Sequence, residues 1–165
     1  MKRVLFLDRD GCLIVEPSDE QVDSLDKLDL MPGVLEALKR LKEFFTFVLV
    51  SNQDGLGTPS FPEPSFSVPH QEMLRLFRAE GVEFERECIC PHFPNDNCIC
   101  RKPKISPELR QYLDKNPDLD LTRSYMIGDR GTDMQLAKNI GCEGITIGPG
   151  NTWSNIASLI LHSFT

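Results

Sequence analysis

The stretch that decides the fold is KRVLFLDRDGC, residues 2–12. Its apolar run Val4–Leu7 is short, continuous and followed by a turn signal at Gly11, which predicts a strand buried on both faces of a parallel sheet. Asp8 and Asp10 follow this strand at once, and ligands of open α/β sheets bind at the carboxyl ends of the strands. Two such close carboxylates repel each other, which favours a divalent metal beside them. On this stretch alone, a solvated acidic turn is an equal alternative.

The length and charge of the chain limit its class. A chain of 165 residues is most simply one domain, residues 1–165, with room for a sizeable core. The net charge of −7 argues against a nucleic-acid partner, because phosphate binding needs a basic face. No apolar run approaches the ~20 residues of a membrane helix, and charged Asp8 interrupts the N-terminal run too early for a signal peptide. We therefore expect a cytoplasmic protein with reduced cysteines.

Strands and helices are expected to alternate along the chain. Apolar runs predict strands at residues 4–7, 45–50, 84–89, 124–127 and 145–147, and helical spacing predicts helices at 33–43, from Pro69 onward, from Pro107 onward, through 134–140 and at 152–162. This alternation is typical of an α/β domain with a doubly wound, mostly parallel sheet.

Two segments between these elements are expected to be irregular. Residues 59–69 contain four prolines and are predicted to form a loop. Residues 16–29 carry six acidic side chains and are expected to be too polar for the core. Their place just after the acidic pair suggests that residues 11–32 form a flap over the site, although single carboxylates there could equally be solvated.

Polar side chains also follow three later strands or their loops. The three pairs are Ser51 with Asn52, Arg101 with Lys102, and Asp129 with Asp133. The hydroxyl and amide could hold an anion, although the same residue types also form ordinary turns. The two cations stand out in an acidic protein and could balance the charge of a phosphate. The last pair repeats the acidic pattern of the first strand.

One loop, residues 90–100, has the composition of a metal site. Its C-x-H-x5-C-x-C pattern is made of Cys90, His92, Cys98 and Cys100. Three thiolates and an imidazole match a closed tetrahedral zinc site, which has no open position for a substrate and is therefore structural. Cys88 is a competing ligand, but the other four residues already complete the coordination.

Together these groups form a set suited to phosphoryl transfer, with acids for magnesium and covalent chemistry and a hydroxyl and cation for phosphate. There is no P-loop lysine motif, which argues against nucleotide hydrolysis of that type. The ordered motifs D-R-D-G, S-N, R-K-P and G-D-R-x-T-D resemble the haloacid dehalogenase (HAD) superfamily of phosphatases. The Cys/His loop resembles its zinc-bearing branch, which includes histidinol-phosphate and heptose-bisphosphate phosphatases, and the run N-Q-D-G-L-G-T most resembles the former. The resemblance extends to about residue 148.

The resemblance implies roles for individual residues. Asp8 would be the nucleophile that forms an aspartyl-phosphate, and Asp10 the general acid and then base. Mg²⁺ would be held by the carboxylates of Asp8 and Asp129 and the backbone carbonyl of Asp10. The remaining implied roles are phosphoryl binding by Ser51 and Lys102, substrate binding by Asn52 and Arg101, and support of the metal by Asp133. A structural Zn²⁺ would occupy the Cys/His loop.

The resemblance also bears on the size of the site and on the chain's partners. Only 49 residues separate Asn52 from Lys102, so no large cap domain is expected and the substrate should be small. Histidinol phosphate, a cationic phosphomonoester, suits an acidic flap, and we expect Glu16, with Asp19 or Asp23, to contact its cationic end. In bacteria such domains are often fused to imidazoleglycerol-phosphate dehydratase.

Three alternatives remain open at this point. A heptose-bisphosphate or related sugar-phosphate phosphatase would use the same machinery on a substrate without a cationic end. A signalling receiver domain also combines aspartates, a hydroxyl and a lysine, but its phospho-acceptor follows the third strand, where this chain has Cys90. A zinc-stabilised interaction module with a dead site is disfavoured because every motif position holds a competent residue.

Overall fold

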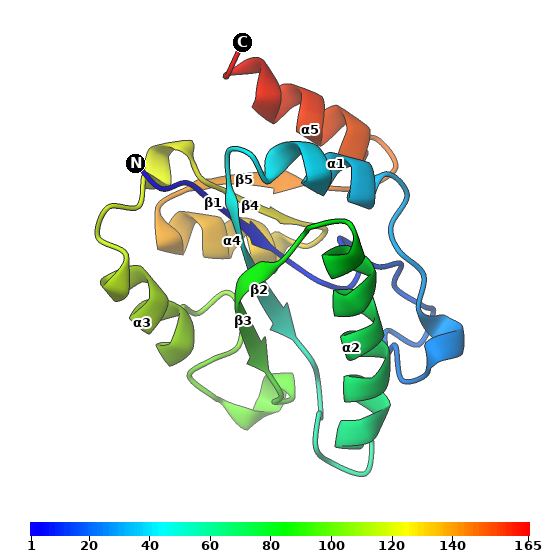
Figure 1. The fold of residues 1–165 in the computed structure, drawn as a ribbon. Coiled ribbons are helices and arrows are strands. Elements are labelled where there is room, and N and C mark those ends of the chain that lie inside the picture. The colour runs from blue at the N-terminus through cyan, green and yellow to red at the C-terminus, as the bar shows by residue number, and fades with distance from the viewer.

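Five strands and five α-helices alternate in the computed structural model, which describes residues 1–165 (Figure 1). The strands are β1 (Val4–Leu7), β2 (Thr46–Asn52), β3 (Phe84–Cys90), β4 (Tyr125–Gly128) and β5 (Glu143–Thr146). The helices are α1 (Val34–Leu41), α2 (Glu63–Ala79), α3 (Pro107–Lys115), α4 (Gly131–Ile140) and α5 (Trp153–His162). All strand pairs are parallel, in the order β3-β2-β1-β4-β5. The expected α/β, doubly wound parallel sheet is therefore confirmed, and no cap domain is present.

The two faces of the sheet are covered by different helices. Successive side chains of a strand point to opposite faces, so Leu5 and Leu7 join a core with α1, α2 and α5, whereas Val4 and Phe6 join one with α3 and α4. Figure 1 shows α1 and α5 packed side by side on the first of these faces. All four residues of β1 are fully buried, as a central strand of a parallel sheet requires.

The order of the strands places the polar strand ends together. The chain runs from β1 outward to β3 on one side and then returns to the other side of β1 through β4. Ligands of such sheets bind where the winding reverses, here between the carboxyl ends of β1 and β4. Asp8 and Asp129 are the residues that follow these two strands.

Helix α2 begins earlier than the sequence predicted. Residues 59–69 were expected to form a loop, but α2 starts at Glu63 and contains Pro69 in its interior. An interior proline costs about 3 kcal/mol. Burial of Phe66 and Met73 offsets that cost. The buried side chains recur at helical spacing both before and after Pro69, so the helix has one continuous buried face. Tertiary packing therefore outweighs the local signal.

The flap is anchored more firmly than its composition suggested. Residues 16–29 were expected to lie outside the core, but Val22 is fully buried within the larger core. The backbone N–H of Val15 donates to the carbonyl of Asp29 over 2.8 Å, which joins the two ends of the acidic stretch. Smaller differences lie at element ends, where β2 extends to Asn52 and β5 begins two residues early. No helix has both the length and the apolar character needed to cross a bilayer.

Candidate active site and metal centre

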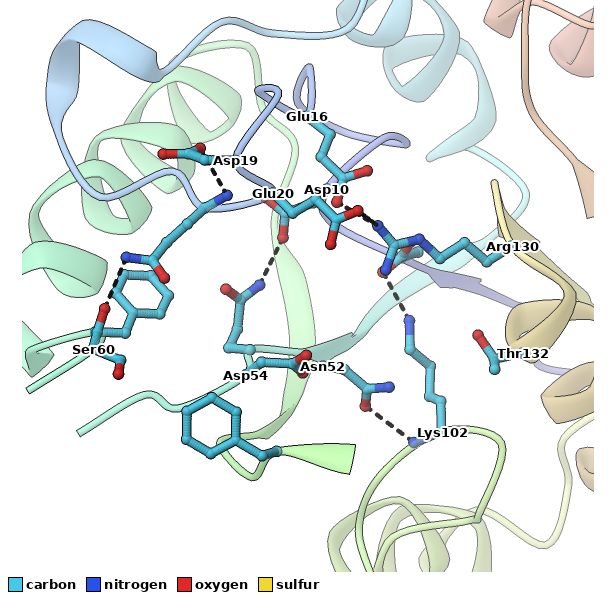
Figure 2. A pocket seen from close by; sticks show the side chains of 15 residues that line it. Asp10, Glu16, Asp19, Glu20, Asn52, Asp54, Ser60, Lys102, Arg130 and Thr132 are labelled. Atoms are coloured by element: carbon cyan, nitrogen blue, oxygen red, sulfur yellow. Dashed lines mark hydrogen bonds and ion pairs between the residues drawn. The ribbon is translucent and has the colours of Figure 1, made fainter. Parts of the chain in front are cut away.

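Lys102 lies at the centre of the strand-end site. Its Nζ donates to Asp8 Oδ1 over 2.7 Å, to Asp133 Oδ1 over 2.8 Å and to the carbonyl of Val50 over 2.9 Å. Its own backbone N–H donates to Asn52 Oδ1 over 3.0 Å, a contact visible in Figure 2. Burial alone would lower the pKa of Lys102, but the charges of Asp8 and Asp133 raise it above its ordinary value. This lysine therefore stays charged and could face a phosphate beside Asp8.

The acidic groups outnumber the cation between them. Carboxylate oxygens of Asp8, Asp129 and Asp133 lie within 4.8 Å of one another, and Asp129 Oδ1 is buried without a hydrogen-bond partner. Burial and the neighbouring charge of Asp8 raise the pKa of Asp129 to about 7. Lys102 contacts the other two carboxylates but not Asp129. An orphaned, buried oxygen in an acidic cluster fits a divalent cation with oxygen ligands.

Two glycines leave space for these carboxylates. A Cβ at Gly11, where φ is +80°, would lie 2.2 Å from Asp129 Oδ2. A Cβ at Gly128 would lie 2.2 Å from Asp133 Oδ2. Any side chain at either position would therefore displace an acid of the cluster, so both glycines are required by the site.

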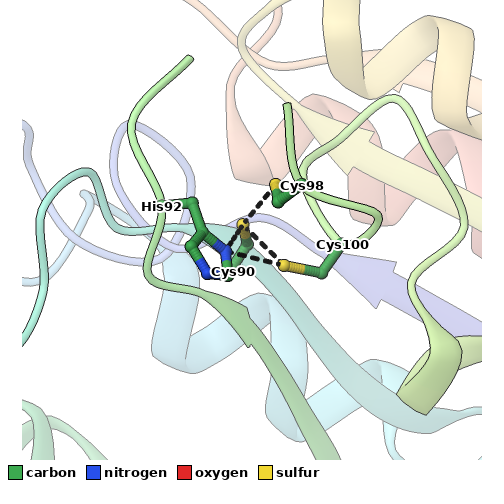
Figure 3. Close-up of side chains that lie close together, drawn as sticks. All are labelled: Cys90, His92, Cys98 and Cys100. Carbon is green, nitrogen blue, oxygen red and sulfur yellow. Dashed lines mark hydrogen bonds between the residues drawn. The ribbon is translucent and has the colours of Figure 1, made fainter. Parts of the chain in front are cut away.

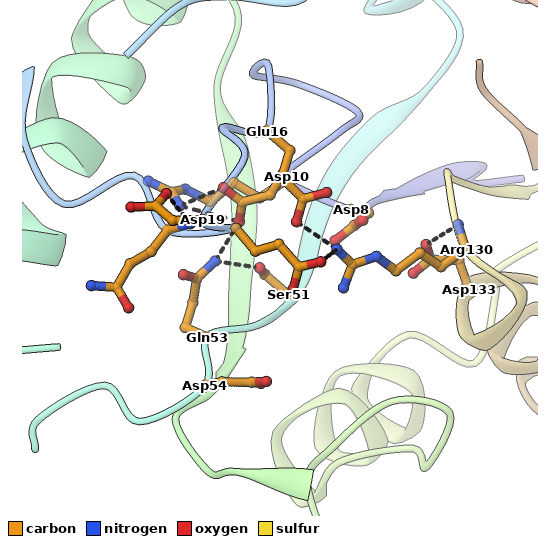
Figure 4. Close-up of polar contacts among 12 residues, drawn as sticks. Asp8, Asp10, Glu16, Asp19, Ser51, Gln53, Asp54, Arg130 and Asp133 are labelled. Carbon is orange, nitrogen blue, oxygen red and sulfur yellow. Dashed lines mark hydrogen bonds and ion pairs between the residues drawn. The ribbon is translucent and has the colours of Figure 1, made fainter. Parts of the chain in front are cut away.

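Asp10 is oriented by two residues to which sequence reasoning assigned no role. Gln53 Nε2 donates to Asp10 Oδ2 over 2.7 Å and to Ser51 Oγ over 2.8 Å, as Figure 4 shows. Arg9 Nη1 contacts both carboxylate oxygens of Asp10 at 3.2 and 3.3 Å. The signal for Gln53 was its place directly after Ser51 and Asn52, but a glutamine side chain can point many ways from a turn. Its direction is set by the tertiary structure.

A cavity of about 220 Å³ opens in front of Asp8 and Asp10 (Figure 2). Its lining includes six carboxylates, which belong to Asp8, Asp10, Glu16, Asp19, Glu20 and Asp54. The cations in the lining are Lys102 and Arg130. Glu16, Asp19 and Glu20 come from the flap, and the lining has an excess of negative charge. Ser51 is buried behind the cavity rather than in its wall.

The flap acids differ in what they contact. Glu16 lines the cavity but is paired with Arg130, and burial raises its pKa against the opposing charge of that arginine. Asp19 lines the cavity and is paired with Lys27 over 2.6 Å. Asp23 is paired with the same lysine over 2.9 Å and does not line the cavity. The structure therefore does not support Asp23 as a residue facing the substrate.

Arg101 contacts the wall of the cavity rather than its interior. It is ion-paired with Asp54, a lining residue, and its Nη1 donates to the carbonyl of His92 over 3.1 Å. Phe93, from the same Cys/His loop, also lines the cavity. The loop at 90–100 and the segment after β2 therefore build one wall together, and Arg101 joins them.

The four predicted metal ligands of residues 90–100 converge (Figure 3). Cys90 Sγ lies 2.9 Å from Cys100 Sγ and 3.6 Å from Cys98 Sγ, and His92 Nδ1 lies 3.2 Å from Cys100 Sγ. Four ligands about 2.0–2.3 Å from a tetrahedral ion would lie at comparable or slightly larger separations. The arrangement therefore fits one four-coordinate ion.

The thiols of the cluster differ in acidity when no metal is bound. Burial raises the pKa of Cys90 to about 12. At Cys98 burial is the largest single influence and would raise the pKa, but hydrogen bonds from the backbone N–H groups of Cys100 and Arg101 and from the Cys90 side chain together lower the pKa to about 6. Cys88 is buried in the core that contains α3 and α4 and takes no part in the cluster, as expected.

Comparison with known proteins shows which hydrolases the chain resembles. A family model described as HAD-hydrolase-like matches residues 99–158. The solved structure of a D,D-heptose 1,7-bisphosphate phosphatase from B. bronchiseptica, in complex with magnesium and phosphate, matches with a TM-score of 0.81 and 28% identity over 99% of each chain. Residues 99–158 thus resemble HAD-type hydrolases in sequence, and the whole chain resembles that phosphatase in fold.

Curated relatives are closer in sequence. The histidine biosynthesis bifunctional protein HisB of Actinobacillus pleuropneumoniae is 51% identical over 163 residues, which cover 98% of this chain and 45% of that protein. HisB of Legionella pneumophila is 50% identical, with coverage of 98% and 46%. The chain thus spans about half the length of the curated relatives it matches.

Proposed function

We propose that the domain hydrolyses L-histidinol phosphate to L-histidinol and phosphate, as an Mg²⁺-dependent phosphomonoesterase of histidine biosynthesis. The observation that carries the proposal is the pairing of a nucleophile site with an acidic cavity. Lys102 holds Asp8 at the base of a small space whose other charged lining residues are mostly anionic. The phosphate would lie against Lys102, and the excess negative charge would attract a substrate with a cationic end.

The proposed reaction proceeds in two steps. A carboxylate oxygen of Asp8 attacks phosphorus, the bond from phosphorus to the ester oxygen breaks, and Asp10 gives its proton to the departing alkoxide. Water then attacks the aspartyl-phosphate, Asp10 takes a proton from that water, and the bond between phosphorus and Asp8 breaks. Phosphate leaves and both aspartates return to their starting state.

Mg²⁺ is the proposed cation of the acidic cluster. The orphaned Oδ1 of Asp129 and the adjacent Asp8 carboxylate fit it. The backbone carbonyl of Asp10 is the third ligand that we propose. When bound, the ion supplies positive charge that offsets the repulsion between the phosphate and the carboxylates. Asp133 acts one step away by orienting Lys102, and Asn52 holds the backbone N–H of Lys102 on the phosphate side of the site. Ser51, which does not line the cavity, would act from behind through its contact with Gln53.

Zn²⁺ is the proposed ion of the Cys/His loop, with a structural role. Its ligands are the four convergent side chains of residues 90–100. The loop carries Phe93 and leads directly into Arg101 and Lys102, so fixing it would fix one wall of the cavity. We propose that Arg101 affects the substrate mainly by holding Asp54.

A panel of phosphomonoesters assayed with Mg²⁺ tests the proposal. Histidinol phosphate should give the highest kcat/KM, neutral alkyl phosphates lower values, and removal of Mg²⁺ should abolish turnover. A second candidate is favoured by the match to a heptose-bisphosphate phosphatase structure. Preference for a sugar bisphosphate over histidinol phosphate would select that candidate and reject ours.

The proposed partner follows from the length of the relatives. They are bifunctional and about twice as long as this chain. We propose that the phosphatase works beside an imidazoleglycerol-phosphate dehydratase domain in the same cytoplasmic protein. The intact mass of the protein isolated from its native cells, together with an assay for both activities, tests this.

A further inference from the structure

Arg9, between the two aspartates of the first motif, is an unusual core residue. Its side chain is 0% exposed, and its only carboxylate partner is Asp10. Its Nε and Nη2 atoms are buried without hydrogen-bond partners. Each unsatisfied buried donor destabilises the folded state, and an apolar side chain of similar size at such a place is often neutral or stabilising. The stability of the fold therefore does not explain this arginine.

The guanidinium is fixed by helix α2. It lies over the ring of Phe66, with its central carbon 5.0 Å from the ring centroid. The ring of His70 stacks on the same Phe66, with the ring centroids 4.7 Å apart and an interplanar angle of 21°. His70 Nε2 in turn lies 2.6 Å from Glu87 Oε1 on β3. A row of stacked groups thus connects the sheet, α2 and Asp10.

This row has a direct effect on the direction of one carboxylate. Asp10 receives a hydrogen bond from Gln53 on one side and the contact of Arg9 on the other. A carboxylate held from two sides has little rotational freedom. A group that transfers a proton must lie within hydrogen-bond reach of the reacting oxygen, and small misplacements cost large factors in rate.

We propose that Arg9 is a positioning residue for Asp10, and that the stack of Phe66 and His70 on α2 keeps Arg9 in place. The proposal rests on the phosphatase function proposed above, in which Asp10 protonates the departing alkoxide. It assigns a role to the first turns of α2, which touch neither the cavity floor nor the metal ligands. Arg9 itself contacts no substrate and acts through Asp10.

Two esters separate positioning from a general loss of structure. Histidinol phosphate has an alkoxide leaving group that needs a proton, whereas p-nitrophenyl phosphate releases a stable anion that does not. The value of kcat/KM reports the first chemical step, transfer of the phosphoryl group to Asp8. Arg9→Met should lower kcat/KM for histidinol phosphate about 10²-fold, the lower end of general acid–base effects, and for p-nitrophenyl phosphate much less. Arg9→Lys should restore part of the loss.

Variants on α2 keep the test decisive if Arg9→Met does not fold. Phe66→Leu removes the aromatic face and should shift the ratio of the two esters in the same direction, by a smaller factor. Phe77→Leu is the matched control, because Phe77 is also a buried phenylalanine of α2 but packs on Phe84 instead. It should leave the ratio unchanged.

The outcomes separate the two proposals. Equal loss on both esters in Arg9→Met and in Phe66→Leu would overturn the positioning role while leaving the phosphatase function intact. Hydrolysis of neither ester by the wild-type protein with Mg²⁺ would reject the phosphatase function. Crystal structures decide the positioning role independently of activity: Asp10 should turn away from Gln53 in Arg9→Met, and an unmoved carboxylate would overturn the proposal.

Discussion

The acidic strand-end site and the Cys/His loop bring their ligands together in opposite ways. Asp8, Lys102 and Asp129 come from distant parts of the chain and meet only because β1 lies between β2 and β4. The four ligands of the loop lie within residues 90–100 and need no sheet to be close. The first site is therefore a product of the fold, whereas the second is a local structure that the fold carries.

The difference also appears in burial. Asp8, Lys102 and Asp133 are buried, and Lys102 is ion-paired with both carboxylates. Cys98 and Cys100 are partly exposed at the surface. The two regions are joined by the chain itself, since Arg101 and Lys102 follow Cys100 directly. A substitution in the loop should therefore affect the acidic site only by displacing Arg101, Lys102 or the cavity wall that the loop forms.

The largest effects are expected from substitutions in the acidic site, which should leave the Cys/His loop unchanged. Asp8→Asn should abolish phosphate release, because an amide does not attack phosphorus. Asp10→Asn should lower kcat about 10²–10⁴-fold. Steady-state assays with histidinol phosphate and Mg²⁺ measure both. Zinc content should remain at wild-type levels in each variant, and turnover near that of the wild type in Asp8→Asn would reject the covalent mechanism.

A smaller effect is expected when the Cys/His loop loses its metal while the acidic residues are unchanged. Metal analysis should find one zinc per chain in the wild-type protein. Cys98→Ser should lose most of it and lower kcat/KM on the order of tenfold, through small displacements of Lys102 and Phe93. Cys88→Ala is the control, since Cys88 lies near the loop but outside the cluster, and it should keep the zinc. Full activity in a zinc-free protein would show that the loop does not support the site.

A smaller effect concerns the pH dependence of stability. With its pKa raised to about 7, Asp129 keeps its proton in the folded metal-free protein after the unfolded chain has lost it. Stability therefore falls as pH rises from about 4 to about 7, because the folded state binds more protons over that range. In EDTA, the unfolding temperature should fall with pH over this range, and Asp129→Asn should flatten the curve.

Magnesium should reverse this trend if Asp129 is a ligand. Addition of Mg²⁺ should raise the unfolding temperature of the wild-type protein more near neutral pH than in acid, because a bound ion favours the ionised carboxylate. The Asn variant should respond little. An equal response of both proteins to Mg²⁺ would place the ion elsewhere, and zinc content measured in parallel shows whether EDTA has also removed the loop metal.

The smallest effect is expected at the flap, where Glu16 is predicted to contact the cationic end of the substrate. Glu16→Gln should raise KM for histidinol phosphate about fivefold, the scale of one partly exposed charge contact of about 1 kcal/mol, with kcat nearly unchanged. Its KM for p-nitrophenyl phosphate should change little. Asp23→Asn is the control, since Asp23 does not line the cavity. Equal changes for both esters would mean that Glu16 serves Arg130 rather than the substrate.

Local sequence patterns predicted much of the acidic site and all four members of the Cys/His cluster. The buried run before Asp8 and the ends of the later strands indicated which polar residues would meet, because parallel strands share one carboxyl edge. The ligands of the loop were predictable because their spacing alone brings them together. The fold class followed from the alternation of strands and helices.

Only the tertiary structure decided the features that depend on the direction of a side chain or on packing between distant segments. The proline-rich start of α2, the burial of Val22 and the pairing of Arg101 with Asp54 all contradict or refine local expectation. Gln53 and Arg9 meet Asp10 because the fold aims their side chains inward. The sequence by itself determined which groups could take part, since residue type and spacing are local. Their orientation was decided by burial against α2 and by the sheet, because long side chains have many rotamers until neighbours exclude all but one.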